Sequence, residues 1–421
     1  MKSWISRLAF GLAAACTALG TQAQQTEIVV DYAIPDLFKE VHEAIAKEFM
    51  ARNPQYKVTF RAPAPGYEEA TQNALRQAVT NQLPDVSYQG LNRQRIFVDR
   101  NLAVELTPFV QKEKNWPSMG YDPALMSLGQ VKGRQYGMGF SLSTPIIYYN
   151  ADLVRRAGGD PASFPSTWEG IFALARKISA LEGKPSGMHY DWDITGNWMW
   201  QALVFSNGGT MLTADEKKVS FDGAAGQKAI ETLAAMVRDG TMRDVSQATA
   251  LQDFISGTLG IWAHSTSRLG GVTKQVGSRF DLRTAPFPVG GNGARLPAGG
   301  NVAMMFAKDP RKQAAAWDYM KFATGPTGAT MMVKATGYFP ANLLPSQDAK
   351  LLGEFYKASP NHVTAIRQLP MLTAWYAFPG DNGLKITDVI KDHLQSVVSK
   401  STPPGDALKT MARDVQVLLP R

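Results

Sequence analysis

Residues 28–60, IVVDYAIPDLFKEVHEAIAKEFMARNPQYKVTF, carry the pattern that decides the fold. The apolar residues 28–30 predict a short buried strand, and residues 56–60 alternate between apolar and polar as a second strand does. Between them an apolar residue recurs every four positions, which is typical of an amphipathic helix; the stripe consists of Leu37, Val41, Ile45 and Phe49. The Asn53-Pro54 pair ends this helix, so the segment predicts a strand–helix–strand unit.

The same alternation continues along the chain. A second helix is predicted by Ala70, Ala74 and Ala78, and a third strand by residues 85–88. This β-α-β-α-β order predicts a parallel sheet flanked by helices. A second set of elements is predicted as strands at residues 145–149 and 258–262 and as helices at residues 171–181, 229–238 and from Asp309-Pro310 onward.

Two local features of these elements can be tested. Ser166-Thr167-Trp168-Glu169 matches a capping box, in which Ser166 and Glu169 each accept a hydrogen bond from a backbone N–H at the start of a helix. Open α/β sheets bind ligands beyond the carboxyl ends of their strands. We therefore expect the site in the loops that follow Tyr32, Phe60, Tyr88, Phe140 and Trp262.

The N-terminus has the composition of an export signal. Lys2 and Arg7 precede an apolar stretch at residues 8–19, which is shorter than the about 20 residues that span a bilayer. Small residues at positions 21 and 23 complete the pattern, so we predict a cleavable signal peptide at residues 1–23. The mature protein is then expected in the periplasm.

The single cysteine, Cys16, lies inside this signal. Lipid attachment at Cys16 therefore stays open as an alternative to cleavage after Ala23. With either cut the mature chain has no disulfide and depends on its hydrophobic core for stability. The roughly 400 residues that remain exceed what one core usually holds, so two lobes are expected.

The charge pattern indicates an ordinary solvated surface. The formal net charge is +8, but the basic residues are scattered among acids, and the longest basic clusters are pairs such as Arg155-Arg156 and Lys217-Lys218. A nucleic-acid partner or a membrane patch would need a concentrated basic stripe. We expect neither.

Motifs for catalysis are missing from the sequence. It contains no phosphate-binding loop, no zinc-protease helix and no nucleophile elbow, and its five histidines are dispersed. Residues 191–196, DWDITG, match the start of a calcium loop, but Ala202 stands where a glutamate would close the coordination sphere. We therefore expect no catalytic residue, no cofactor and no metal. A secreted carbohydrate-active hydrolase that uses Asp191 and Asp193 stays open as an alternative.

Aromatic residues in polar, glycine-rich settings are the strongest chemical signal. Residues 187–209 contain Trp192, Trp198 and Trp200 beside carboxylates and amides, and Tyr67 and Tyr338 each follow a glycine. Sugars and polyols are recognised by aromatic faces that pack on C–H groups and by polar side chains that bond to hydroxyls. If residues 198–200 are helical, their two tryptophans cannot face the same side.

Four motifs extend this interpretation to a known family: residues 143–153, STPIIYYNADL; residues 164–169, FPSTWE; residues 299–301, GGN; and residues 336–340, TGYFP. In these stretches the chain resembles the extracellular solute-binding proteins of carbohydrate ABC importers, and among them most the glycerol-3-phosphate binders. The resemblance covers essentially the whole mature chain.

The resemblance implies a two-lobed α/β periplasmic binding protein of type II, with a hinge and a ligand cleft between the lobes. The first lobe would contain residues 27–139 and 303–338, and the second residues 140–302 and 339–421. The implied function is reversible binding of a sugar, polyol or glycerol-phosphate derivative and its delivery to permease subunits at the inner membrane. We expect a monomer. A sensory role with a chemoreceptor stays open.

The resemblance also implies ligand-binding residues, namely Tyr67, Ser143, Trp192, Trp198, Ser265, Gly300 and Tyr338, with Thr266 as an alternative to Ser265. Two positions depart from the glycerol-3-phosphate binders. Their glutamate after the third strand is missing from Tyr88-Gln89-Gly90-Leu91, and Pro379 stands in place of the arginine that holds phosphate. Arg268 and Lys385 are candidate substitutes for that arginine. A neutral sugar or polyol is therefore as plausible a ligand as a phosphate ester.

Overall fold

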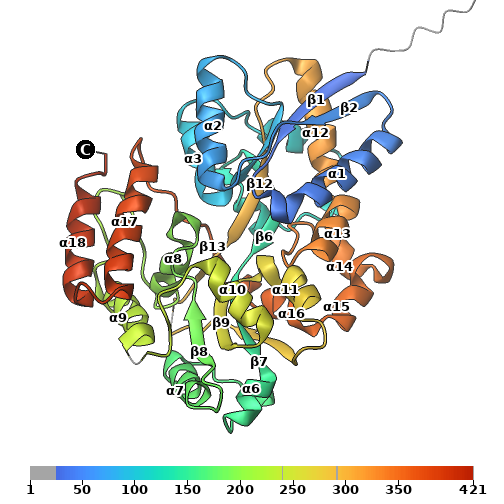
Figure 1. The fold of residues 1–421 in the computed structure, drawn as a ribbon. Coiled ribbons are helices and arrows are strands. Elements are labelled where there is room, and N and C mark those ends of the chain that lie inside the picture. The colour runs from blue at the N-terminus through green and yellow to red at the C-terminus, as the bar shows by residue number, and fades with distance from the viewer. Residues whose placement is uncertain (1–24, 239, 291–292, 421) are drawn as a thin grey trace, which may run out of the picture.

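The computed structural model describes residues 25–238, 240–290 and 293–420. The predicted signal peptide and Cys16 lie outside these residues. Two β-sheets, each covered by helices, form two lobes, as the expected α/β class requires (Figure 1). Among the described residues, no helix combines the length and the apolar character that a membrane span needs.

The first lobe is built on a five-stranded sheet in the order β2-β1-β3-β12-β6. Its strands are β1 (Thr26–Asp31), β2 (Tyr56–Phe60), β3 (Val86–Gly90), β6 (Gly137–Ser143) and β12 (Gly299–Met305). β1 runs parallel to β2 and to β3, which confirms the predicted parallel β-α-β-α-β unit. Its principal helices are α1 (Pro35–Arg52), α2 (Tyr67–Val79), α3 (Gln94–Asp99), α12 (Pro310–Thr324) and α13 (Pro326–Ala335).

The second lobe is built on a four-stranded sheet in the order β10-β7-β9-β8. Its strands are β7 (Pro145–Asn150), β8 (Ser186–Tyr190), β9 (Leu259–Ser265) and β10 (Leu282–Pro286). Its principal helices are α6 (Ala151–Arg156), α7 (Trp168–Ser179), α8 (Trp198–Phe205), α9 (Ala224–Arg238), α10 (Gln247–Ser256), α11 (Leu269–Val276), α17 (Gly383–Val398) and α18 (Pro404–Gln416).

The chain passes between the lobes at adjacent points. β6 leads into β7 through Thr144, and the short strand β11 (Leu296–Pro297) leads into β12 through Ala298. β6 and β12 are antiparallel neighbours, so these two connections leave the first sheet side by side. Phe339 joins them through backbone hydrogen bonds with Leu142, of 2.7 and 2.9 Å.

The domain boundaries predicted from the sequence are cut by two strands. β6 crosses the boundary at residue 139, and β12 crosses the one at residue 302. Residues 339–421 were assigned to the second lobe, whereas Leu352 is buried in the core that contains α1 and α12 of the first lobe. Apolar residues after a hinge can join either core, and periodicity does not distinguish the two. The assignment of each segment to a lobe stays a proposal.

The capping prediction for α7 is wrong by one residue. The N-cap is Thr167, whose hydroxyl accepts a hydrogen bond from the backbone N–H of Gly170 at 3.2 Å. Ser166 lies outside the helix, so Glu169 is not three residues after the cap and no capping box forms. Asp309, in contrast, caps α12 as predicted and accepts from two backbone N–H groups.

His42 is an unusual member of the core of the first lobe. Its side chain is fully buried on α1, and its ring centroid lies 4.9 Å from that of Phe140 and 4.3 Å from that of Tyr88. Neither of its ring nitrogens has a hydrogen-bond partner among the described residues. Burial lowers the pKa of His42 to about 3, so the imidazole is neutral at pH 7.

Thr167→Ala is expected to lower the free energy of unfolding by about 1 kcal/mol, because the cap is lost. Ser166→Ala is the matched control and should stay within about 0.5 kcal/mol of the parent, since Ser166 caps nothing. Urea denaturation of both variants measures the difference. Equal losses, or a larger loss for Ser166→Ala, would contradict the assignment of Thr167 as the cap.

His42→Phe is expected to make the protein less sensitive to acid. Below about pH 6.5 the unfolded chain takes up a proton at His42 that the native state refuses until about pH 3. The native state therefore loses about 1.4 kcal/mol per pH unit from this group in that window. Denaturation curves at pH 7 and pH 4 should show a smaller loss for the variant than for the parent. Parallel losses would show that His42 is protonated in the native state.

Candidate ligand-binding site

One cavity between the lobes collects most of the residues expected to bind ligand. We name it the aromatic pocket; its volume is about 270 Å³. Six predicted residues line it, namely Tyr67, Ser143, Trp198, Ser265, Gly300 and Tyr338. Part of its lining comes from the segments that follow β1, β2 and β9, three of the five loops in which the strand order predicted a site, and Ser143 is the last residue of β6.

The structure also separates residues that sequence patterns could not. Trp192 is buried in the core and is not among the residues that line the aromatic pocket. Trp375, Gln247, Arg268, Asp36 and His264 do line it. Trp375 and Gln247 are absent from the ligand-binding residues that the sequence predicts. Trp375 lies in an irregular segment without periodicity, and Gln247 begins an ordinary helix. The family comparison placed Arg268 only as a possible substitute for an arginine.

The aromatic wall is assembled from both lobes. The ring of Trp375 lies 6.5 Å from that of Tyr67 and 6.3 Å from that of Trp198, measured between centroids. Gly196 and Asn197 both adopt left-handed backbone conformations, with φ of 61° and 55°, and these turn α8 so that Trp198 faces the pocket. The indole N–H of Trp198 is buried and has no partner among the described residues, so it is an unsatisfied donor on a side chain that lines the pocket.

Trp200 faces the opposite way. It lies two residues after Trp198 on α8 and packs against Phe221, with ring centroids 6.2 Å apart. It does not line the aromatic pocket. This confirms the prediction that the two tryptophans cannot share a face.

Two tyrosine hydroxyls supply a polar edge. The hydroxyl of Tyr67 accepts a hydrogen bond from Asn301 Nδ2 at 3.1 Å. Tyr338 and Ser267 line the same pocket. Burial raises the pKa of both tyrosines above the ordinary value, so both stay protonated at neutral pH. The pocket therefore presents neutral hydroxyls to a ligand.

The Gly299-Gly300 turn brings backbone to the pocket surface. Gly300 has φ of 103°, and a Cβ there would lie 1.9 Å from the carbonyl oxygen of Ser141. A Cβ on Gly299 would lie 2.6 Å from Ser143 Oγ and 2.9 Å from the indole of Trp198. Glycine is required at both positions, since any side chain would push these groups apart.

The buried carboxylate of Asp191 stabilises the turn that carries Ser265. Asp191 Oδ2 accepts a hydrogen bond from Trp262 Nε1 at 2.8 Å and lies 3.3 Å from His264 Nε2. His264 Nδ1 accepts the backbone N–H of Ser265 at 2.6 Å. Burial lowers the pKa of His264 to about 4, so its ring is neutral at pH 7. The carboxylate thereby fixes the orientation of His264 and of the turn.

These contacts bear on the calcium-like segment and on the hydrolase alternative. Asp191 is fully buried, and Asp193 Oδ1 accepts from Gln247 Nε2 at 2.9 Å. Neither carboxylate is among the residues that line the aromatic pocket. Across the described residues, no group of three or more His, Cys, Asp or Glu side chains is placed to hold a metal ion. The two carboxylates therefore serve internal contacts.

Of the two candidate substitutes for the phosphate-binding arginine, only Arg268 lies in the aromatic pocket. Arg268 lines the aromatic pocket, where its Nη1 lies 2.7 Å from Asp36 Oδ2. Lys385 and Pro379 do not line it. Gln89, in the segment where the family has a glutamate, is buried and bonded to Thr71 at 3.1 Å. No residue of the late loop at 377–385 takes the place of the family's arginine in this pocket.

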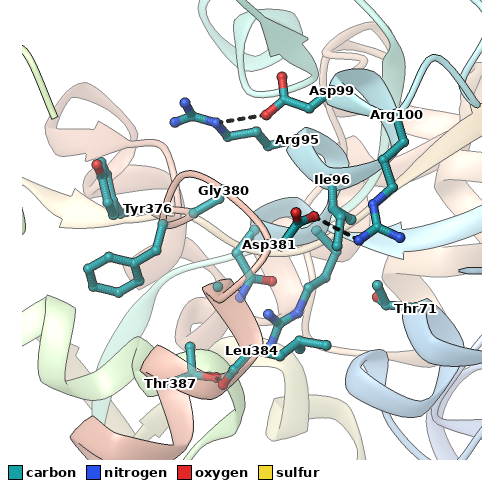
Figure 2. A pocket seen from close by; sticks show the side chains of 15 residues that line it. Thr71, Arg95, Ile96, Asp99, Arg100, Tyr376, Gly380, Asp381, Leu384 and Thr387 are labelled. Atoms are coloured by element: carbon teal, nitrogen blue, oxygen red, sulfur yellow. Dashed lines mark hydrogen bonds and ion pairs between the residues drawn. The ribbon is translucent and has the colours of Figure 1, made fainter. Parts of the chain in front are cut away.

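A second cavity, of about 500 Å³, lies between α3 and the segment at residues 376–387 (Figure 2). We name it the arginine cavity. Arg100 faces Asp381 across it at 2.8 Å, and Arg95 is bonded to Asp99 and, in two contacts of 2.6 and 2.7 Å, to Glu216. Each of these two guanidiniums already has carboxylate partners. The arginine cavity thus marks a place where the lobes hold each other, and it lacks the tryptophans of the aromatic pocket.

Comparison with known proteins supplies the family. The model of a family described as bacterial extracellular solute-binding proteins matches residues 44–362. The sn-glycerol-3-phosphate-binding periplasmic protein UgpB of Agrobacterium fabrum is 24% identical over 356 residues, which cover 82% of this chain and 80% of the relative. UgpB of Escherichia coli K12 is 23% identical over 99% of this chain and 97% of its own length.

Solved structures share the fold. UgpB from Mycobacterium tuberculosis, solved in complex with glycerophosphocholine, superposes with a TM-score of 0.81 at 21% identity and covers 92% of this chain and 97% of its own. The cyclic alpha-maltosyl-1,6-maltose binding protein from Arthrobacter globiformis has a TM-score of 0.77 at 19% identity and covers 94% of this chain and 99% of its own. With a family match that spans most of the sequence, the chain belongs to the bacterial extracellular solute-binding proteins, the ligand-capturing components of ABC importers.

Proposed function

We propose that the protein reversibly binds a sugar, polyol or glycerol-phosphate derivative in the aromatic pocket and delivers it to permease subunits at the inner membrane. The observation that carries this proposal is the convergence of six residues, from distant parts of the sequence, on one cavity between the lobes. Relatives named for sn-glycerol-3-phosphate support the ligand class. In this function the protein makes and breaks no covalent bond and acts as a monomer.

The chemistry of the aromatic pocket suits a small hydroxylated solute. The rings of Trp198, Trp375 and Tyr67 offer faces for C–H groups, while the Trp198 indole and the serine hydroxyls exchange hydrogen bonds with ligand hydroxyls. Pockets for drug-sized ligands span roughly 300–1,000 Å³. At about 270 Å³ the aromatic pocket lies just below that range and favours a ligand of about one or two sugar units.

Lobe closure is the expected mechanism of capture. Tyr67 comes from the first lobe and Trp198 and Ser265 from the second, so the pocket is complete when the lobes meet. Contacts between the lobes flank it, with Asp36 and Arg268 on its own wall and Arg95 and Glu216 beside the arginine cavity. Exposed ion pairs each contribute roughly 0–1 kcal/mol, so they can hold the closed form and still permit release.

A thermal-shift screen of the mature protein tests the proposal. The panel contains maltose, glycerol, glycerol-3-phosphate and glycerophosphocholine at millimolar concentration. A ligand present at 100 times its Kd is expected to stabilise the protein by about 2.7 kcal/mol. A shift with at least one compound supports the proposal. No shift across these and a wider set of sugars and glycerophosphodiesters would overturn it.

Trp198→Phe is expected to weaken binding of the compound that shifts the protein most by about 3- to 10-fold, because a donor is lost while an aromatic ring stays. Trp200→Phe is the matched control on the same helix and should leave the Kd unchanged, since Trp200 faces Phe221. Isothermal titration calorimetry measures both. Equal weakening in the two variants would mean that α8 acts only through stability.

A further inference from the structure

The charged side chains of the aromatic pocket balance one another. Among the residues that line it, Asp36 and Arg268 are the carboxylate and the guanidinium, and the buried His264 is the imidazole. His264 is neutral at pH 7, because burial lowers its pKa to about 4. The pocket therefore offers one positive and one negative group, without excess charge for a ligand to neutralise.

The two charges are held together by geometry. Asp36 lies in the first turn of α1 in the first lobe, and Arg268 ends the short helix Thr266–Arg268 in the second lobe. Arg268 Nη1 donates to Asp36 Oδ2 at 2.7 Å, so the pair joins the two lobes at the wall of the aromatic pocket. Any phosphate that reached Arg268 would have to compete with this carboxylate and would lie close to its negative charge.

We propose that Asp36 sets the charge selectivity of the aromatic pocket by occupying Arg268, so that the protein favours solutes without net charge over phosphate monoesters. This inference rests on the proposed function and refines it. Arg268 is the guanidinium best placed to hold a phosphate in the pocket, but its hydrogen bond to Asp36 makes it less available to a phosphate. A neutral sugar, a polyol or a zwitterionic phosphodiester binds without paying for displacement of the pair.

The matched control is the ion pair between Arg100 and Asp381. It also joins residues on facing segments of the two lobes, at 2.8 Å, but it lines the arginine cavity and not the aromatic pocket. Asp36→Asn and Asp381→Asn each remove one carboxylate from a pair across the cleft. Both side chains are exposed, at 59% and 86%, so neither variant is expected to unfold. A change specific to Asp36→Asn therefore reports selectivity rather than closure.

The experiment compares Kd values for glycerol-3-phosphate, glycerophosphocholine and maltose by calorimetry at pH 7.5. In Asp36→Asn the affinity for glycerol-3-phosphate, relative to the better of the other two compounds, should rise about tenfold, because a phosphate can then form charge-assisted bonds with Arg268. In Asp381→Asn this ratio should stay at the parent value. Adding Arg268→Gln to Asp36→Asn should abolish the gain.

An unchanged ratio in Asp36→Asn, or an equal rise in Asp381→Asn, would overturn the inference while leaving the proposed function intact. A gain that survives Arg268→Gln would overturn it as well, because another group would then hold the phosphate. Failure of the proposed function is distinct: in that case the parent protein would bind none of the three compounds, nor any other member of the screening panel.

Discussion

The antiparallel pairing of β6 with β12 fixes where the two lobes meet. Ser143 and Gly299 are register partners at the hinge ends of these strands, so both connections to the second lobe start from one point. Phe339 adds a third segment there through its backbone hydrogen bonds with Leu142. The part of the aromatic pocket nearest the hinge, including Tyr338, is thus positioned mainly by backbone. The wall made of Trp198 and its neighbours is carried by the second lobe.

Several contacts between the lobes are ion pairs that are partly exposed. The pair Arg268–Asp36 lines the aromatic pocket, and the pairs Arg95–Glu216 and Arg100–Asp381 lie beside the arginine cavity. Exposed pairs are screened by salt and individually weak. Such pairs can separate and re-form as the lobes move, which suits a protein that must release what it binds.

Much of the fold could be predicted from the sequence, because alternating strand and helix periodicities leave few topologies for a chain of this size. Six of the pocket-lining residues came from the family resemblance, and their convergence on one cavity required coordinates. The failures have local causes: Ser166 and Thr167 are equally good caps, so only backbone geometry selects Thr167. Trp192 and Trp375 lie in irregular segments, where no period indicates which way a ring points.

The glycine pair of the pocket has an evolutionary consequence. A methyl group at Gly300 would collide with the backbone of β6, and one at Gly299 would collide with Ser143 Oγ and the indole of Trp198, so a new side chain at either position requires these groups to move. A homologue that evolves to bind a different ligand must therefore change residues on the other side of the cleft. Gln247 and Trp375 lie there on an ordinary helix and an irregular segment, and both positions already carry large side chains. Changes in ligand specificity are therefore expected mainly from substitutions on the far side of the cleft, while the residues beside the hinge stay the same.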